Sequence, residues 1–225
     1  MLSGLFSWLR GSKTSTRVAF NDMTVASLPL LAIDLELTSL DTKQAEITSI
    51  GWVGAKNYSI DLSTCRYEVI QTNAVLGQSP VIHGLTSEVL EKGQPLNEVI
   101  GSLYPLLKHH VLVFHNATLD LAALDNAIKQ CGLPKVSVTF IDTLQLAVYQ
   151  LKKQHQVLPN NSATLTVCRQ RLGLPIAPEH NALDDALATL QLLLAQYTQL
   201  GVTSSSRLGE MKHTHATGRK ALGRI

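Results

Sequence analysis

The sequence has few cysteines, no long apolar run and little net charge. Its three cysteines, Cys65, Cys131 and Cys168, are widely spaced and form no CxxC pair. This pattern argues against a disulfide or zinc framework and indicates free thiols in a reducing cytoplasm. No apolar stretch approaches the roughly 18–20 residues of a membrane span. The N-terminal sequence lacks the basic leader and small-residue cleavage site of a secretory signal. We therefore expect a cytoplasmic protein without a membrane span.

The composition is that of an ordinary globular protein with one domain. Hydrophobic residues make up 45% and charged residues 16% of the 225 residues, which is enough for one full core. The net charge of +2 is unevenly distributed, because residues 201–225 hold five basic residues and one acid. This tail carries +4 and the remainder of the chain −2. A charge of this size neither excludes a nucleic-acid partner nor argues for one.

The chain divides into three segments. Residues 1–27 are interpreted as an N-terminal appendage that contains a short amphipathic helix, which could pack on its own domain or dock to a partner or a membrane surface. The apolar residues at helical spacing in this appendage are Leu2, Leu5, Phe6 and Leu9. Residues 28–200 form the expected domain. Residues 201–225 are basic, rich in Ser, Thr and Gly, and poor in apolar periodicity, so we expect a disordered tail.

The apolar patterns within the domain predict an α/β fold. The run at 28–33 predicts a buried strand that ends at an acid pair, and residues 47–73 predict an antiparallel meander. Two further buried strands are expected, at 111–116 and 136–143. Helical patterns occupy 85–93, 95–110, 119–130, 144–152, 164–173 and 182–200. Asn181 is placed to cap the last helix and Gly201 to end it. This order predicts a mixed five-stranded sheet, in which an antiparallel meander joins parallel strands and helices flank the faces.

Four carboxylates and a histidine occur where strands end or helices begin. Asp34 and Glu36 point to the same face of a strand, because side chains alternate along it. Asp120 follows the second buried strand by six residues, and His180 precedes the acids at 184 and 185. Acids that converge on one site repel one another unless cations hold them together. This set therefore predicts a site for two hard divalent ions, with the histidine available to move a proton.

Each of these residues also has an ordinary structural interpretation. Asp120 could cap a helix or complement its dipole, as acids in a first turn often do. The helical period does not choose between Asp184 and Asp185, which flank the apolar face on opposite sides. His115 and Asn116 could close a turn or line the cleft. A lone histidine is more often a hydrogen-bonded loop residue than a base.

Three segments, taken together, match an ordered set of motifs. DLELTS at 34–39 is close to D-x-E-T-T-G, HNATLD at 115–120 to H-N-x-x-F-D, and HNALDDA at 180–186 to H-x-A-L-x-D-A. In order and spacing they resemble the motifs of the DnaQ-like 3′–5′ exonucleases, a family that includes the proofreading subunit of bacterial DNA polymerase III. The resemblance implies an RNase H-like fold over residues 28–200, and it selects Asp185 rather than Asp184 as the acid of the third motif.

The resemblance implies a metal-dependent hydrolase of phosphodiester bonds. Two Mg²⁺ or Mn²⁺ ions would be held by carboxylates, and His180 would take the proton from the attacking water. The metal ligands implied are Asp34, Glu36, Asp120 and Asp185. The implied substrate is the 3′ end of single-stranded DNA or RNA, with DNA favoured, and the implied products are nucleoside 5′-monophosphates.

Substrate contacts are implied for six residues of the first two motifs, namely Leu35, Leu37, Thr38, His115, Asn116 and Leu119. Leu37 and Ser39 replace Thr and Gly of the first motif, and Leu119 replaces Phe of the second. These changes alter the expected substrate fit but keep every metal ligand.

Two alternatives to a DNA exonuclease stay open. One is an RNA-trimming exoribonuclease of the same chemistry, because the choice of polymer depends on contacts to the 2′-hydroxyl. The other is a mainly interacting polymerase-associated subunit with little activity. Such a subunit would bind a polymerase or other protein through the N-terminal helix or the basic tail.

Overall fold

The computed structural model describes residues 20–39, 41, 45–72, 85–154 and 159–223. The strands are β1 (Leu30–Leu37), β2 (Ile47–Lys56), β3 (Ser59–Val69), β4 (Val111–Phe114), β5 (Val136–Asp142) and β6 (Thr217–Leu222). They form one six-stranded sheet in the order β3-β2-β1-β4-β5-β6. The first three strands are an antiparallel meander, β1, β4 and β5 are parallel, and β6 is antiparallel to β5. The predicted mixed α/β sheet is confirmed, but the expected number of five strands is wrong.

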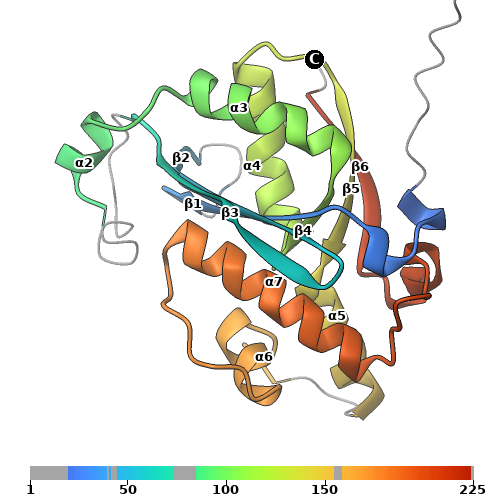
Figure 1. Ribbon diagram of the computed structural model, residues 1–225. Helices are drawn as coiled ribbons and strands as arrows, with labels where there is room; N and C mark the ends of the chain where they lie inside the picture. The colour runs from blue at the N-terminus through green and yellow to red at the C-terminus, as the bar shows by residue number, and fades with distance from the viewer. Residues whose placement is uncertain (1–19, 40, 42–44, 73–84, 155–158, 224–225) are drawn as a thin grey trace, which may run out of the picture.

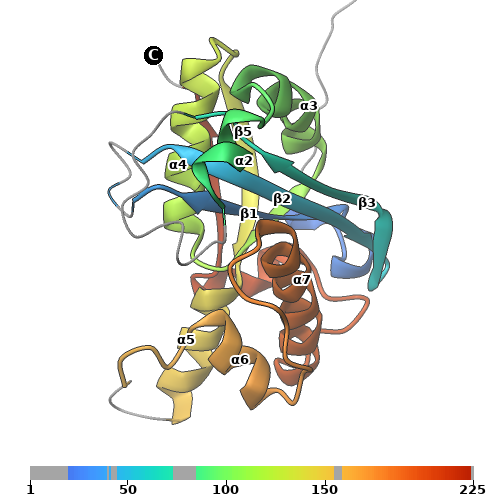
Figure 2. The ribbon, with the colours of Figure 1, turned by 90° about the vertical axis from the view of Figure 1, so that its left-hand side faces the viewer.

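Helices cover both faces of this sheet. They are α2 (Ser87–Glu91), α3 (Leu96–His109), α4 (Ala117–Gln130), α5 (Thr143–Gln154), α6 (Leu165–Arg171) and α7 (Ala182–Gln199). α3 and α4 lie on one face and α7 lies on the other, with α6 beyond it (Figures 1 and 2). Alternation along β1 divides its side chains between two cores: Leu31 and Ile33 pack toward α3 and α4, and Leu30 and Ala32 toward α7. Within the described residues no helix combines the length and apolar character that a membrane crossing requires.

Strand β1 extends past its parallel neighbour. The sequence predicted that this strand would end at the acid pair, but it continues through both acids to Leu37. β4 pairs with β1 only between Leu30 and Ala32, whereas β2 pairs along the whole of β1. Asp34 and Glu36 therefore lie beyond the end of β4, on the face that α7 covers. The difference in strand length leaves room beside the acids for the elements that follow β4.

Helix α7 begins and ends where the sequence indicated. The side chain of Asn181 accepts hydrogen bonds from the amides of Leu183 and Asp184, at 3.0 and 3.3 Å. Gly201 lies just after the helix with a φ of +69°, a conformation that favours glycine. Both predicted signals are confirmed, so the first turn of α7 is fixed in place next to β1.

The tail is ordered from Leu208 to Leu222. The prediction of a disordered tail is therefore wrong for this segment. The 3-10 helix η3 (Leu208–Thr214) precedes β6, which pairs with β5 from Val136 to Ile141. Four apolar side chains of this segment are buried: Leu208, Met211, Ala216 and Leu222. An edge strand is held mainly by its backbone ladder, so a basic, Thr- and Gly-rich sequence with few apolar anchors can form it. The basic tail is thus part of the sheet rather than a free arm.

The end of the predicted N-terminal appendage also belongs to the folded unit. Two short 3-10 helices, η1 (Phe20–Asp22) and η2 (Val25–Ser27), bury Phe20 and Val25. The amide of Val25 donates to the carbonyl of Ser206 at 2.8 Å, which joins this segment to the tail. The amphipathic helix expected over the first ten residues lies outside the described residues.

Candidate active site

Three carboxylates from two elements meet at the end of the sheet. Asp34 and Glu36 on β1 and Asp185 in the first turn of α7 each offer an oxygen atom, and these atoms lie within 4.8 Å of one another. Glu36 is buried, while Asp34 and Asp185 are partly exposed. Carboxylate oxygens at this spacing are the ligands that hard divalent cations prefer. Of the two candidate acids on α7, Asp185 joins this acid cluster.

Asp120 approaches the acid cluster from α4. It lies in the first turn of that helix and is buried, with 5% of its surface exposed. Burial, followed by the charges of Asp142 and Glu36, raises the pKa of Asp120, and hydrogen bonding to the backbone opposes this rise. The charge of Asp120 in turn adds to burial in raising the pKa of Asp34. The amides of Asn116 and Ala117 at the start of α4 donate to Asp142, so Asp142 rather than Asp120 caps this helix.

Burial raises the pKa of every acid in this group, and the charges of neighbouring acids raise it further. Burial is the largest cause for each one. The pKa of Asp34 is raised well above its ordinary value, by burial and then by the charge of Asp120. Burial and the charge of Asp185 raise the pKa of Glu36 to about 7. Burial raises the pKa of Asp185 to about 6, although a hydrogen bond from the amide of His180 opposes this. A bound cation would relieve this repulsion, so the acids present fit a divalent metal site.

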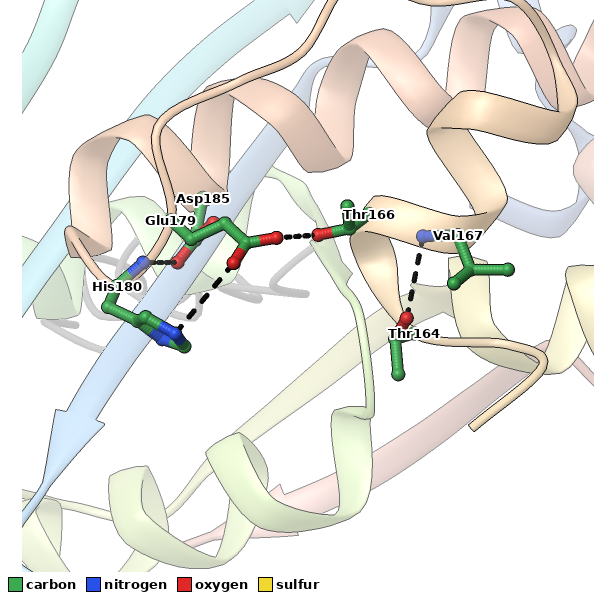
Figure 3. Close-up of polar contacts among 6 residues, drawn as sticks. All are labelled: Thr164, Thr166, Val167, Glu179, His180 and Asp185. Atoms are coloured by element: carbon green, nitrogen blue, oxygen red, sulfur yellow. Dashed lines mark hydrogen bonds and ion pairs between the residues drawn. The ribbon is translucent and has the colours of Figure 1, made fainter. Parts of the chain in front are cut away.

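His180 lies next to the acid cluster on the loop between α6 and α7. Its φ of +66° is in the left-handed region, and its amide donates to Oδ2 of Asp185 at 3.0 Å. Its side chain is half exposed, and Nε2 lies 3.9 Å from Oε2 of Glu179. The hydroxyl of Thr166, on α6, donates to the other oxygen of Glu179 (Figure 3). The predicted base is therefore joined to the acid cluster through its backbone, and its ring is open to solvent.

The apolar residues predicted to contact substrate lie largely in the core. Leu35 and Leu37 are only 6% and 8% exposed and belong to the core beneath α3 and α4. Leu119 is partly buried and packs against the same core. Their contact with a nucleobase stays a prediction.

The polar residues predicted to contact substrate all have partners within the protein. The ring nitrogens of His115 bond to Oγ1 of Thr143 at 2.8 Å and to the carbonyl of Ala163 at 2.9 Å, which favours the turn-closing interpretation. Asn116 has a φ of 87° and begins α4. The hydroxyl of Thr38 accepts from the amide of Glu46 at 3.0 Å, just after β1. Substrate contacts of these three residues also stay predictions.

Asp142 organises the elements around Asp120. Its buried carboxylate accepts hydrogen bonds from the amides of Asn116 and Ala117, both at 3.1 Å, and from the amide of Leu144 at 3.0 Å. It therefore caps α4 and α5 together at the ends of two adjacent strands. The sequence analysis placed this residue in the strand expected at 136–143 and did not indicate this role.

Gly51 is a second positioning residue that the sequence analysis did not single out. It pairs with Asp34 across the β1–β2 ladder, and the start of α7 crosses directly over it. A Cβ at this position would lie 2.2 Å from the backbone of Ala182 and Leu183. Only glycine allows α7 to come this close, so Gly51 sets the distance between Asp185 and β1. A glycine inside a strand pattern was the available signal, because it often marks a close backbone approach.

Comparisons with known proteins agree with this architecture. The sequence model of a family described as exonuclease matches residues 31–193. The chain is 29% identical over 197 residues to a PolC-type DNA polymerase III of Thermotoga maritima, covering 86% of this chain. It is 26% identical over 170 residues to the 3′–5′ exonuclease DinG of Staphylococcus aureus, covering 73% of this chain. The aligned regions make up only 14% and 18% of the lengths of these two relatives.

A solved structure supports the fold. Exonuclease X in complex with 5′-overhanging duplex DNA superimposes with a TM-score of 0.59 and 21% sequence identity. The match covers 81% of this chain and 98% of that one. At this identity the likeness concerns the fold alone.

Proposed function

Because the chain belongs to the exonuclease family, and is thus a nuclease, we propose that it removes nucleotides one at a time from the 3′ end of single-stranded DNA. The observation that carries this proposal is the acid cluster, in which oxygens of Asp34, Glu36 and Asp185 lie within 4.8 Å of one another. Acids at this spacing repel one another, and this repulsion adds to burial in raising the pKa of Asp34 and Glu36. Such a group is stable near neutral pH when divalent cations bind it.

The cations proposed are two ions of Mg²⁺ or Mn²⁺. Asp34, Glu36 and Asp185 would hold them, and Asp120 would complete the set of acids. Two ions are favoured over one, because four carboxylates carry twice the charge that a single divalent ion neutralises. When bound, such ions lower the pKa of water and neutralise charge on a phosphate.

The proposed reaction uses His180 as the base. Its imidazole takes a proton from water as the water oxygen forms a bond to the phosphorus of the terminal phosphodiester. The bond from phosphorus to the 3′ oxygen of the preceding nucleotide breaks, this oxygen takes a proton from solvent to become a hydroxyl, and the terminal nucleotide leaves as a nucleoside 5′-monophosphate. The exposed ring next to the acid cluster supports this role, because it is open to solvent and to substrate.

DNA is proposed over RNA on the basis of the relatives. The Thermotoga relative is a DNA polymerase, and exonuclease X was solved with duplex DNA. A polymerase partner is proposed because several of the matching relatives are themselves DNA polymerases.

Digestion of matched 5′-labelled single-stranded DNA and RNA tests the proposed function. With Mg²⁺ or Mn²⁺, wild-type protein should give a ladder that shortens from the 3′ end, and faster on DNA. EDTA should abolish the ladder because it removes the ions. Asp34→Ala should abolish it because it removes a carboxylate of the metal site. Faster digestion of RNA would overturn the substrate assignment. No ladder on either polymer, or equal activity of Asp34→Ala, would overturn the exonuclease at this site.

A further inference from the structure

The loop that carries His180 is held at its start by a buried arginine. Arg169, on α6, is 4% exposed. Its guanidinium donates one hydrogen bond to the carbonyl of Pro175 and one to that of Ala188, both at 2.8 Å. These bonds join the beginning of the loop to α6 and α7. They leave the far end of the loop, where His180 lies, to be held by other contacts.

At that far end, Glu179 bridges α6 and His180. One of its carboxylate oxygens accepts a hydrogen bond from the hydroxyl of Thr166, and the other lies 3.9 Å from Nε2 of His180 (Figure 3). Thr166 belongs to a helix whose own start is capped by Thr164. A chain of contacts therefore runs from α6 through the hydroxyl of Thr166 and the carboxylate of Glu179 to the imidazole of His180.

The bond from Thr166 makes this arrangement more than a surface pair. The side chains of His180 and Glu179 are 53% and 51% exposed, and a pair so exposed fixes little geometry by itself. A carboxylate held by a helix has fewer positions open to it than a free one. The backbone of His180 is fixed separately, by the bond from its amide to Asp185. Glu179 lies against Nε2 of the ring itself, so it bears on the orientation of the imidazole.

We propose that Glu179, anchored by Thr166, is a positioning residue for His180. The inference rests on the proposed function, in which His180 takes a proton from water. Bases in enzymes are commonly oriented by a third group in this way. In this role Glu179 acts through His180 and transfers no proton. Glu179 reduces the number of orientations open to the imidazole, so the ring more often faces the attacking water.

Substitutions at the anchor test the proposal in the 225-residue chain. Thr166→Val removes the hydroxyl and keeps the shape of the side chain. It should lower kcat on 5′-labelled single-stranded DNA by about tenfold, with KM unchanged, because only the orientation of the base is lost. Thr166→Ser keeps a hydroxyl and should restore kcat. Glu179→Ala should match Thr166→Val, and the double variant should fall no further, since both changes break one unit.

The same substitution in a His180→Ala background separates positioning from general structure. Without the imidazole there is nothing to orient, so Thr166→Val should then leave the residual rate unchanged. An equal tenfold loss in that background would overturn the proposal, as would an unchanged kcat of Thr166→Val in the wild-type background. Thr198→Val, an exposed hydroxyl near the end of α7, is the matched control and should have wild-type kcat.

A spectroscopic measurement keeps this proposal distinct from the proposed function. In protein with ¹³C-labelled histidine, the imidazole signal of His180 is identified by its loss in His180→Ala. Thr166→Val should broaden or shift that signal, and Thr198→Val should not. If the imidazole signal of His180 is unchanged in Thr166→Val, Thr166 does not anchor the ring through Glu179, even if the enzyme is active. A wild-type protein with no nuclease activity but the expected change in signal would overturn the role in catalysis, and the failure would then lie in the proposed function.

Discussion

Ionised Asp34 destabilises the folded chain, and its proposed role as a metal ligand explains why an acid stands at this position. Buried acids with raised pKa values favour their protonated forms, so they stabilise the folded chain at low pH and destabilise it when ionised. For Glu36 this loss begins near its ordinary pKa of 4.5 and is complete near 7. For Asp185 the window runs from 3.8 to about 6. Near neutral pH the metal-free protein therefore carries repulsion that bound cations remove.

Asp34→Asn should consequently stabilise the metal-free protein at pH 7.5 while abolishing activity. A neutral amide removes one of the repelling charges, so the melting temperature in EDTA should rise by a few degrees. At pH 4.5 the difference should largely vanish, because much of the wild-type acid cluster is then protonated. Millimolar Mg²⁺ should raise the melting temperature of wild type at pH 7.5 but not that of the variant.

The exposed Asp22 supplies the control for this experiment. Asp22→Asn should melt as wild type does under all of these conditions. If Asp34→Asn melted lower than wild type at pH 7.5 in EDTA, repulsion within the acid cluster would not be the dominant force there.

At the residue scale, the sequence predicted the acids better than their supports. Asp34 and Glu36 could be found because their spacing along a strand has a chemical reason, whereas Asp185 was selected over Asp184 only through the resemblance to the exonuclease motifs. Glu179 could not be found in this way, since an acid before a histidine has no periodic signal. Its contact with Thr166 arises only when α6 and the loop fold together.

At the element scale, the site depends on how closely α7 approaches the sheet. The first turn of α7 supplies Asp185, and Gly51 on β2 lies directly beneath it. The sequence predicted the start of this helix through Asn181, because capping is a local interaction. It did not predict the approach to β2, which depends on two segments about 130 residues apart.

Gly51→Ala should therefore damage the site through the backbone. The new Cβ would meet main-chain atoms of Ala182 and Leu183 at 2.2 Å, so the start of α7 must move away from β1. A displacement of about 1 Å at a catalytic group can cost on the order of a hundredfold in rate. We expect kcat to fall at least tenfold and the affinity for Mg²⁺ to weaken, measured by digestion and by titration calorimetry.

The matched control is Gly101→Ala in α3, where a Cβ would meet nothing within 4 Å. That variant should keep full activity and gain about 0.5–1 kcal/mol in stability, because alanine favours a helix interior. Full activity and unchanged metal affinity in Gly51→Ala would show that the close packing of α7 on β2 at Gly51 does not set the geometry of the site.

At the scale of the whole molecule, the α/β sheet was predictable and its last strand was not. Apolar runs and helical periods identified β1, β4, β5 and the helices between them. β6 escaped because edge strands are held by backbone hydrogen bonds, which a basic sequence with few apolar residues makes as well as any other. The segment from Phe20 to Ser27 was missed for a related reason, since its contacts are to the distant tail.

Anomalous diffraction from crystals soaked in Mn²⁺ locates the cation itself and therefore decides whether the acid cluster is a metal site. We expect anomalous peaks in contact with the carboxylates of Asp34, Glu36 and Asp185, and their loss in crystals of Asp34→Asn. Peaks found only elsewhere on the molecule, or peaks that persist unchanged in Asp34→Asn, would contradict this expectation.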